Sequence, residues 1–562
     1  IIRFIGFSEL WNIVKAATVY AFIWGLLALL IMFPEPVSYL KLPRSVILLN
    51  WFLATFTLAG IRIFARYLLT DIVATSKINV VIYGAGASGI DLHASLIKSK
   101  SYHVLYFIDD SSRIQGRSIN GVDVISFIKF KKLIKIKNIQ EVLLAMPSSS
   151  RSRSKEIMSI LTPLSLIVKS LPSLHELLEG KVSINDLREI KIKDLLGRPI
   201  TPSDEFQLTS DNIGNVVMVT GAGGSIGSEI CRQIASLKPD ILILYEHNEF
   251  SLYSIFEELK YDFKDALKVL PILGSVTNTT RLQNVLKEFK VQTIYHAAAY
   301  KHVPMVEYNH IEGAENNIIG TLSCAEAANE ANVNTFVLIS TDKAVRPTNT
   351  MGATKRFAEL ILQSFSSRGS NTKFIAVRFG NVLGSSGSVI PLFEKQIKGG
   401  GPLTITDPKM ERFFMTISEA VELVIQAGTI GKGGEIFILN MGEPVSILEL
   451  AKKMINLSGL QIKDSKNPYG DIEIQYTGLR PGEKLFEELL ISNSSMPTSH
   501  PMIINAIEEF ISWNELEPLL DELKVVIKNY NHERLRQLLC QAVPHFNPQS
   551  HISDVLYKSN NK

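Results

Sequence analysis

The feature that most constrains the fold is a glycine-rich turn between an apolar strand and a helix. Residues 215–220 form an apolar, β-branched run, and Gly221-Ala-Gly-Gly224-Ser-Ile-Gly227 follows it directly. Glycines let a backbone pass close to a pyrophosphate, and the N-terminus of the next helix, expected near Ser228, supplies amide donors and a favourable dipole. This order predicts a dinucleotide-binding unit. The cofactor residues predicted from the turn are Gly221, Gly224, Ser225, Ile226 and Gly227.

Three further strands continue this unit. Residues 241–245 end at Glu246, a carboxylate placed to accept the hydroxyls of an adenosine ribose. Because a carboxylate repels a 2′-phosphate, it favours NAD over NADP. Residues 269–273 lead to an edge for the adenine, and residues 291–295 lead to small side chains that let a cofactor lie close. The residues predicted at these two places are Ser275, Val276, Ala297, Ala298 and Ala299.

A second, smaller unit precedes this one, over residues 71–170. Short β-branched runs at 79–83, 104–108 and 141–145 alternate with helical periods, which predicts a small α/β unit with a parallel sheet. The turn after its first strand reads GAGASG over residues 84–89, and Asp109 and Asp110 end the next strand. A glycine turn of this kind also serves packing alone, so the motif leaves cofactor binding, nucleotide-sugar binding and a structural role open.

The first seventy residues contain two long apolar segments, 16–33 and 45–61. Each has about the length that a helix needs to cross a bilayer, and the prolines between them end helices. They predict a transmembrane hairpin that contacts the lipid bilayer. Arg3, Lys15, Arg62 and Arg66 flank the hairpin and favour a cytoplasmic position for both of its ends. The alternative is a pair of buried helices.

Composition excludes several classes of function. The 58 basic and 55 acidic residues leave a net charge of +3, too small over 562 residues for a surface that coats nucleic acid. The three cysteines form no metal-binding spacing, so no metal site is predicted. The remaining segments are predicted as a linker at 171–210, a catalytic domain with a small C-terminal substrate lobe at 211–500, and a helical segment at 501–562.

A cluster of reactive side chains follows the strand predicted at 335–339. Thr341, Asp342 and Lys343 lie directly after it, and Met351 precedes Lys355 by one helical turn. Residues one turn apart lie on the same face of a helix. An aspartate and a lysine at a strand end of a dinucleotide-binding unit indicate acid–base chemistry rather than a surface ion pair. The catalytic residues predicted are Thr341, Asp342, Lys343, Met351 and Lys355.

Five long motifs occur in a fixed order along the chain. They are TGAGGSIGSE at 220–229, HAAAYKHVPMVE at 296–307, STDKAVRPTNTMGATK at 340–355, RFGNVLGSSG at 378–387 and GLRPGEK at 478–484. Together they resemble the CapD/WbpM-type polysaccharide-biosynthesis proteins, which are membrane-bound UDP-N-acetylhexosamine 4,6-dehydratases of the extended short-chain dehydrogenase/reductase superfamily. Most enzymes of that superfamily have a tyrosine where this chain has Met351, and methionine is typical of the large membrane-bound members.

The resemblance implies a reaction and roles for these residues. A hydride leaves sugar C4, a base removes the C5 proton, an acid protonates the departing C6 hydroxyl, and the hydride returns at C6. Lys343 would be the base, Asp342 the acid and Thr341 the hydrogen-bond partner of the C4 oxygen, because a thioether cannot transfer a proton. Lys355 would hold the ribose hydroxyls of the cofactor. Lys343 then needs a lowered pKa and Asp342 a raised one, although their mutual attraction opposes both shifts.

The resemblance also implies how substrate binds and where the protein acts. The nucleotide sugar is expected in the C-terminal lobe, since arginine matches phosphate oxygens well. It further implies a homo-oligomer in the bacterial inner membrane, with the catalytic domains facing the cytoplasm. The candidate substrate residues are Lys301, His302, Asn317, Arg378, Asn381, Arg412, Arg480 and Glu483.

Two alternatives of function stay open at this point. A nucleotide-sugar 4-epimerase or a 5-inverting dehydratase would share the fold and the cofactor. A membrane scaffold that regulates glycan assembly, with a degenerate site, would explain Met351, but the presence of Asp342, Lys343 and Lys355 argues against it.

Overall fold

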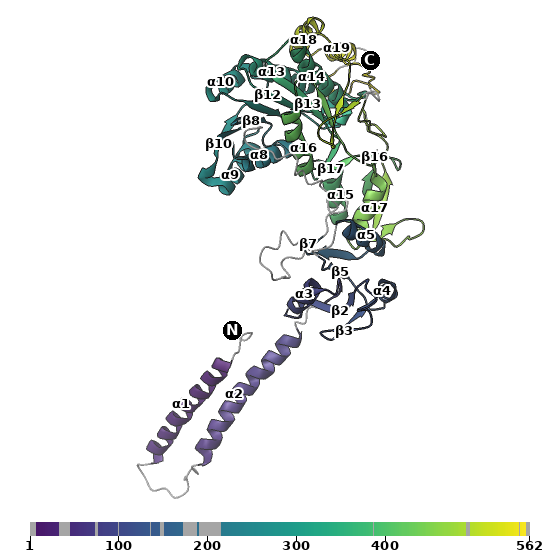
Figure 1. The fold of residues 1–562 in the computed structure, drawn as a ribbon. Coiled ribbons are helices and arrows are strands. Elements are labelled where there is room, and N and C mark those ends of the chain that lie inside the picture. The colour runs from purple at the N-terminus through teal and green to yellow at the C-terminus, as the bar shows by residue number, and fades with distance from the viewer. Residues whose placement is uncertain are drawn as a thin grey trace. The chain divides into compact units, whose positions relative to one another are not determined.

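The computed structural model of the chain describes most of its length (Figure 1). The chain divides into two compact units, Ile1–Pro147 with Leu171–Leu187 and Ser148–Ser170 with Arg188–Lys562. Most of the linker predicted at 171–210 lies outside the described residues. The described residues are 7–32, 45–72, 77–98, 101–134, 136–146, 151–171, 188–189, 215–385, 387–480, 482–490, 495–549 and 551–557.

The first unit begins with two long helices, α1 (Phe7–Met32) and α2 (Ser45–Ile72), which lie side by side (Figure 1). The Trp51 indole donates a hydrogen bond to Thr18 Oγ1 at 3.0 Å. The apolar segments 16–33 and 45–61 therefore form a helical hairpin, and both helices extend beyond the predicted runs. Among the described residues, however, no helix is both long and apolar enough to cross a membrane, so the transmembrane part of the prediction is not supported.

The rest of the first unit is built on a small sheet in which β1 lies between β2 and β5 and pairs parallel with both, while β3 at the edge pairs antiparallel with β4. The turn after β1 is closed by acidic side chains: Asp109 Oδ2 accepts from Ala85 N at 2.9 Å, and Tyr83 Oη donates to Asp110 Oδ1 at 2.9 Å. Ligand binding by this turn stays a prediction. The elements are β1 (Ile78–Tyr83), α3 (Ala87–Lys98), β2 (Tyr102–Ile108), β3 (Ser118–Ile119), β4 (Val122–Ile125), α4 (Phe127–Leu133) and β5 (Glu141–Leu144).

Residues 148–170, assigned to the small unit from the sequence, group with the second unit instead. Ser165 Oγ donates to Asn456 Oδ1 at 3.4 Å, and Gly459 lies so close to Ile167 that a Cβ on the glycine would come within 2.9 Å of the Ile167 side chain. The pattern of apolar residues within 148–170 does not predict this packing against the C-terminal lobe, because it depends on residues far along the chain. The elements here are α5 (Arg151–Leu161), η2 (Thr162–Leu164), β6 (Ile167–Ser170) and β7 (Arg188–Glu189).

A nine-stranded sheet forms the centre of the second unit. Its order is β10-β9-β8-β11-β12-β13-β18-β23-β22; the first seven strands are parallel, and β23 and β22 pair antiparallel. This is the doubly wound arrangement predicted from the glycine turn. The strands are β8 (Val216–Thr220), β9 (Ile241–Glu246), β10 (Lys268–Leu273), β11 (Thr293–His296), β12 (Thr335–Ile339), β13 (Lys373–Arg378), β18 (Ile436–Leu439), β22 (Ser495–Pro497) and β23 (Ile503–Ala506).

Helices cover both faces of this sheet, because the strands are apolar on both sides. One core includes Phe336, Phe357 and Phe374, and the other includes Ile234 and Val424. The first is covered by α10 (Thr279–Phe289), α13 (Gly320–Glu330), α14 (Thr350–Ser367), α18 (Trp513–Lys528) and α19 (His532–Ala542). The second is covered by α8 (Ser225–Ser236), α9 (Glu249–Phe263) and α16 (Ile417–Ile430).

A smaller lobe with its own core follows β13 in the chain. Phe393, Leu450 and Ile472 lie in this core. The segment 501–562, predicted as helical, begins with strand β23 and continues as α18 and α19. The remaining elements of the second unit are η4 (Lys264–Ala266), α11 (Val303–Glu307), α12 (His310–Ala314), η5 (Glu315–Ile319), η6 (Asp342–Ala344), β14 (Asn381–Leu383), α15 (Val389–Lys398), β15 (Leu403–Ile405), β16 (Glu411–Arg412), β17 (Phe414–Thr416), β19 (Val445–Ser446), α17 (Ile447–Leu457), β20 (Ile462–Lys463) and β21 (Ile472–Tyr476).

Candidate active site

The glycine turn after β8 has no room for side chains. Gly221 has a φ of +66°, and a Cβ there would lie 2.8 Å from the backbone of Ala298. A Cβ on Gly227 would lie 2.0 Å from Gly221 O. Helix α8 begins at Ser225, with Gly224 as an N-cap that makes no side-chain hydrogen bond. The first amides of a helix have no intrahelical partner, so this end can bind an anion.

Glu246 closes the outer end of the same groove. Its buried carboxylate accepts hydrogen bonds from the backbone amides of Gly223, His247 and Asn248, each at 3.0 Å. These bonds orient the carboxylate and leave lone pairs for ribose hydroxyls. A cavity of about 390 Å³ is lined by most of the predicted cofactor residues, namely Gly221, Gly224, Glu246, Ser275, Val276, Ala297, Ala298 and Ala299. A second cavity, of about 580 Å³, shares Gly224, Ala297 and Ala299 with it and is lined by Ser225, Ile226 and Gly227.

Lys355 is a buried cation on α14. It is only 5% exposed, and no side chain in the described part of the chain forms a hydrogen bond or an ion pair with its ammonium. Burial lowers its pKa to about 8, opposed by the charge of Glu359. Burial, together with Lys355, also lowers the pKa of His296 to about 3, so that imidazole is neutral and packs between Thr220 and Thr321. A buried ammonium without a hydrogen-bond or ion-pair partner is costly to hold in the folded protein.

The reactive cluster after β12, Thr341 to Lys343, is connected by a chain of hydrogen bonds. Thr341 caps the short helix η6: its Oγ1 accepts from Lys343 N at 3.3 Å and donates to Asp342 Oδ1 at 2.8 Å. Lys343 Nζ donates to the same Oδ1 at 3.0 Å. The second oxygen, Asp342 Oδ2, is buried and has no hydrogen-bond partner. Thr341, Asp342 and Lys343, which the sequence analysis predicts to act together, are thus in direct contact.

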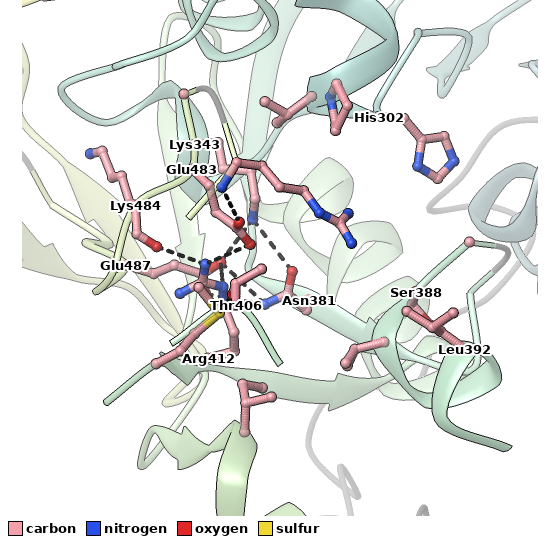
Figure 2. Close-up of a pocket in the computed structure, with 18 of the residues that line it drawn as sticks. His302, Lys343, Asn381, Ser388, Leu392, Thr406, Arg412, Glu483, Lys484 and Glu487 are labelled. Atoms are coloured by element: carbon pink, nitrogen blue, oxygen red, sulfur yellow. Dashed lines mark hydrogen bonds and ion pairs between the residues drawn. The ribbon is translucent and has the colours of Figure 1, made fainter. Parts of the chain in front are cut away.

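Glu487 completes this cluster, and sequence reasoning missed it. Its Oε1 accepts from Lys343 Nζ at 2.9 Å, and Asn381 Nδ2 lies 3.1 Å from its Oε2 (Figure 2). Arg412 Nε lies 3.1 Å from Oε1 as well. The available signal was an acidic residue three positions after the GLRPGEK motif, but its distance of 144 residues from Lys343 hid the contact.

The charges of this cluster are strongly coupled. Burial acts to raise the pKa of Asp342, but Lys343 and Thr341 outweigh burial and hold that pKa below its ordinary value. Burial acts to lower the pKa of Lys343, yet Asp342 and Glu487 together raise it well above its ordinary value. Burial, reinforced by Asp342, raises the pKa of Glu487. In this state Lys343 is an ammonium and Asp342 a carboxylate, the reverse of what the sequence analysis required for catalysis.

A cavity of about 280 Å³ opens onto Asp342 and Lys343 (Figure 2). Lys301 and His302 line both this cavity and the one at the start of α8, so the two cavities are neighbours at these residues. His302 packs so tightly on Gly387 that a Cβ there would lie 2.4 Å from the imidazole. Six of the predicted substrate residues line this cavity: Lys301, His302, Asn381, Arg412, Arg480 and Glu483.

Arg412 lines the cavity but has many protein partners. Besides its ion pair with Glu487, it donates to Lys484 O at 2.7 Å and to Leu485 O at 3.0 Å. Its guanidinium therefore holds the segment 482–488 in place. Arg480 precedes that segment, and its backbone N donates to Glu483 Oε2 at 3.2 Å.

Two predicted substrate contacts are wrong. Arg378 is fully buried, and its guanidinium forms ion pairs with Glu359 and Glu508. Asn317 is also buried; it bonds to both backbone groups of Tyr300 and to Thr354 Oγ1. Both polar side chains form ion pairs or hydrogen bonds with other residues of the protein. The order of residues along the chain does not distinguish such internal contacts from ligand binding.

Met351 is 2% exposed and lies one turn before Lys355 in α14, as the spacing predicted. The side chain carries no proton that could be transferred. Met351 itself can therefore serve neither as an acid nor as a base.

Comparisons with known proteins support a specific family. Residues 217–508 match the model of a family described as "Polysaccharide biosynthesis protein". The chain is 39% identical over 541 residues to the capsular polysaccharide biosynthesis protein CapD of Staphylococcus aureus, covering 94% of this chain and 87% of that protein. It is 40% identical over 495 residues to the probable polysaccharide biosynthesis protein EpsC of Bacillus subtilis (strain 168), covering 87% and 80%. Among solved structures, Pen from Bacillus thuringiensis is 34% identical, with 55% of this chain and 99% of Pen covered and a TM-score of 0.47.

Proposed function

The chain belongs to the polysaccharide biosynthesis protein family, and from this premise we propose that it removes water from a UDP-N-acetylhexosamine. The proposed substrate is UDP-N-acetylglucosamine, the proposed product is its 4-keto-6-deoxy derivative, and the proposed cofactor is NAD. The observation that carries the proposal is the Thr341, Asp342 and Lys343 cluster, whose Asp342 and Lys343 line a cavity that shares Lys301 and His302 with the cavity at the start of α8.

The cofactor groove fits a dinucleotide. The turn at Gly221 and Gly227 leaves no room for side chains, and Glu246 is oriented by three backbone amides at the end of β9. Its carboxylate favours NAD, since it would repel a 2′-phosphate. Lys355 would hold the nicotinamide ribose, which gives its buried ammonium a partner. When bound, the nicotinamide takes a hydride from C4 and later gives it to C6.

The dehydration requires one net proton movement, from the C4 hydroxyl to the departing C6 hydroxyl. Thr341 Oγ1 donates to Asp342 Oδ1 at 2.8 Å, so a proton that leaves the C4 oxygen can pass through Thr341 to Asp342. An ionised Asp342 is the correct starting state for this relay, which agrees with its lowered pKa. Once protonated, Asp342 delivers the proton to the C6 oxygen and water leaves. The resting carboxylate therefore becomes an acid during the reaction.

Lys343 is the proposed base for C5. Its amine takes the C5 proton as the C6–O bond breaks and returns a proton to C5 when the hydride arrives at C6. Its ammonium lies 3.0 Å from Asp342 and 2.9 Å from Glu487, at the wall of the substrate cavity. The diphosphate would be held by cations that line the same cavity, chiefly Lys301 and Arg480, since Arg412 holds the segment 482–488.

The test is to incubate the full chain with NAD and UDP-N-acetylglucosamine, and to follow the product by mass spectrometry and NMR. We expect the loss of one water and a 4-keto-6-deoxy sugar with retained C5 configuration. Epimerisation at C4 without loss of mass would favour the 4-epimerase alternative, and inversion at C5 the 5-inverting one.

Two variants test the assigned roles. Lys343→Ala and Asp342→Asn should each abolish product formation and leave the affinity for NAD unchanged, because neither side chain lines the dinucleotide cavities. Turnover at the wild-type rate in either variant would contradict the role of that residue.

A further inference from the structure

Lys343 cannot act as a base in the state that the structure shows. An ammonium has no lone pair, so it must lose a proton before it can take one from C5. Asp342 is not available as the acceptor, because in the proposed relay it receives the proton of the C4 hydroxyl. Another group in contact with Lys343 Nζ must therefore take the ammonium proton.

We propose that Glu487 is this acceptor, a positioning residue that takes the Lys343 proton and so provides the neutral amine for attack on the C5 proton. The inference rests on the proposed function. Glu487 Oε1 lies 2.9 Å from Lys343 Nζ, in direct hydrogen-bond contact. Of the acceptors around this nitrogen, Asn381 Oδ1 at 3.4 Å is an amide and cannot hold a proton.

The surroundings of Glu487 hold its carboxyl group toward Lys343. Arg412 Nε lies 3.1 Å from Oε1, Asn381 Nδ2 3.1 Å from Oε2, and Phe413 N 3.4 Å from Oε2. The side chain is 3% exposed. The charged groups that face it are Lys343, Asp342 and Arg412, which come from η6 and β16. Because both oxygens of the carboxyl group are held by these contacts, the group stays beside Lys343 Nζ, with which it can exchange a proton.

Closure of the cavity by substrate favours the transfer. Excluding water weakens the solvation of a carboxylate and an ammonium, whereas a neutral acid and a neutral amine lose much less. Burial already raises the pKa of Glu487, while Asp342 and Glu487 together raise that of Lys343. When Asp342 becomes protonated by the C4 hydroxyl, Lys343 loses one of its two carboxylate partners, and its hold on the proton weakens.

The proton balance closes over one cycle. The Lys343 proton moves to Glu487, and the neutral amine takes the C5 proton and later returns a proton to C5. Glu487 then gives its proton back to Lys343. Asp342 has meanwhile carried the C4 hydroxyl proton to the departing water, so no other acid, base or oxidant is needed.

The decisive variant is Glu487→Gln, which keeps the size of the side chain but cannot accept the proton. We expect turnover at neutral pH to fall about 100-fold, the scale of general acid–base catalysis, with NAD affinity unchanged. Because Lys343 must then lose its proton to solvent, the remaining rate should increase with pH, whereas the wild type should reach a plateau. Glu487→Asp, which keeps the carboxyl group, should recover part of the lost turnover.

The matched control is Glu449→Gln, which changes an exposed glutamate of the same lobe whose carboxylate pairs with Lys452. It should leave turnover and the pH profile unchanged. If Glu487→Gln fails to fold, Glu487→Asp decides: complete loss of turnover in this folded variant means that a carboxyl group at position 487 is not enough to support the reaction, and overturns the inference. Wild-type turnover and an unshifted pH profile in Glu487→Gln overturn it too. A wild-type protein that makes no dehydrated product would instead overturn the proposed function, and this inference with it.

Discussion

At the scale of single residues, Lys355 links burial to ligand binding. Its pKa is lowered to about 8 by burial, so the folded protein holds the ammonium below that pH and loses it above. In an unfolded chain the same lysine keeps its proton up to the ordinary lysine pKa. The free energy of unfolding without ligand therefore rises with pH between about 8 and that ordinary pKa. A bound ribose would offset the cost of the charge by accepting hydrogen bonds from it.

We predict that Lys355→Met lowers NAD affinity at pH 7 by about 10-fold or more, the scale of a lost charge-assisted hydrogen bond. The wild-type affinity should fall as the pH rises through about 8, whereas that of the variant should stay flat. The free energy of unfolding without NAD should be equal or higher, because a buried unpaired cation is removed. Calorimetric titration from pH 7 to 9.5 and urea unfolding measure these effects. A variant with wild-type affinity would contradict the ribose contact.

Met351 tests whether the usual tyrosine position has any chemical task here. It is buried on the same helix face as Lys355, and we predict that Met351→Leu keeps turnover within about threefold and costs less than about 1.5 kcal/mol of stability, as volume-conserving core changes do. Steady-state kinetics and urea unfolding check both values. Complete loss of activity in a folded variant would mean that the thioether contacts a reacting group.

At the scale of elements, the turn from β8 to α8 has no room for side chains. We predict that Gly227→Ala destabilises the protein by more than about 1 kcal/mol and abolishes NAD binding, because its Cβ would lie 2.0 Å from Gly221 O. Gly86→Ala, in the turn of the first unit, is the matched control, since nothing lies within 4 Å of its added Cβ. Thermal unfolding with and without NAD compares the two variants. Equal losses of stability and of NAD binding in both would contradict the proposed role of the turn from β8 to α8.

The segment 482–488 shows how one element assembles the site. Arg412 binds the carbonyl groups of Lys484 and Leu485, while Asn349 Nδ2 donates to Gly482 O at 2.9 Å. The segment is thereby held between the loop before α14 and strand β16. This double attachment brings Glu487 to Lys343, and it explains why the GLRPGEK motif belongs to the site although its own arginine lies at the rim.

At the scale of the whole molecule, a buried ionic network connects elements far apart in the chain. Glu359 of α14 pairs with Arg378 of β13, which also pairs with Glu508 beyond β23. Burial acts to raise the pKa of Glu359, but Arg378 outweighs it and the pKa lies below its ordinary value. Because the pKa of Glu359 is lower in the folded protein, its ion pair stabilises the fold fully above the ordinary glutamate pKa of about 4.3. This contribution to the free energy of unfolding is lost as the pH falls through the pKa that Glu359 has in the folded protein.

We predict that Glu359→Gln lowers the free energy of unfolding at pH 7 by about 3–5 kcal/mol, because Glu508 is then the remaining carboxylate partner of two buried arginines, Arg356 and Arg378. The difference from the wild type should shrink as the pH falls below the ordinary glutamate pKa of about 4.3, because the carboxyl group of the unfolded chain is protonated there while the folded protein still holds it ionised. Urea unfolding at pH 7 and pH 3.5 measures both. Glu449→Gln, which breaks only an exposed ion pair, should cost less than about 1 kcal/mol.

Much of the second unit could be predicted from local sequence. Strand 335–339 was predicted at its observed bounds, and 241–245 and 269–273 to within one residue, because buried parallel strands are short apolar runs. The glycine turn and the spacing of Met351 and Lys355 are equally local. The family resemblance, which rests on long ordered motifs, is confirmed by the family match and by CapD.

What the sequence by itself determined is the fold class, the dinucleotide groove and the cluster from Thr341 to Lys343, because each depends on residues that are neighbours along one strand or helix. Only the tertiary structure decided the rest: it turned Arg378 and Asn317 inward, grouped residues 148–170 with the second unit, and placed Glu487 against Lys343 across 144 positions. The physical reason is that burial and pairing of a charge depend on which segments meet in space. The same attraction between Asp342, Lys343 and Glu487 also set the resting protonation state that chain order left undecided.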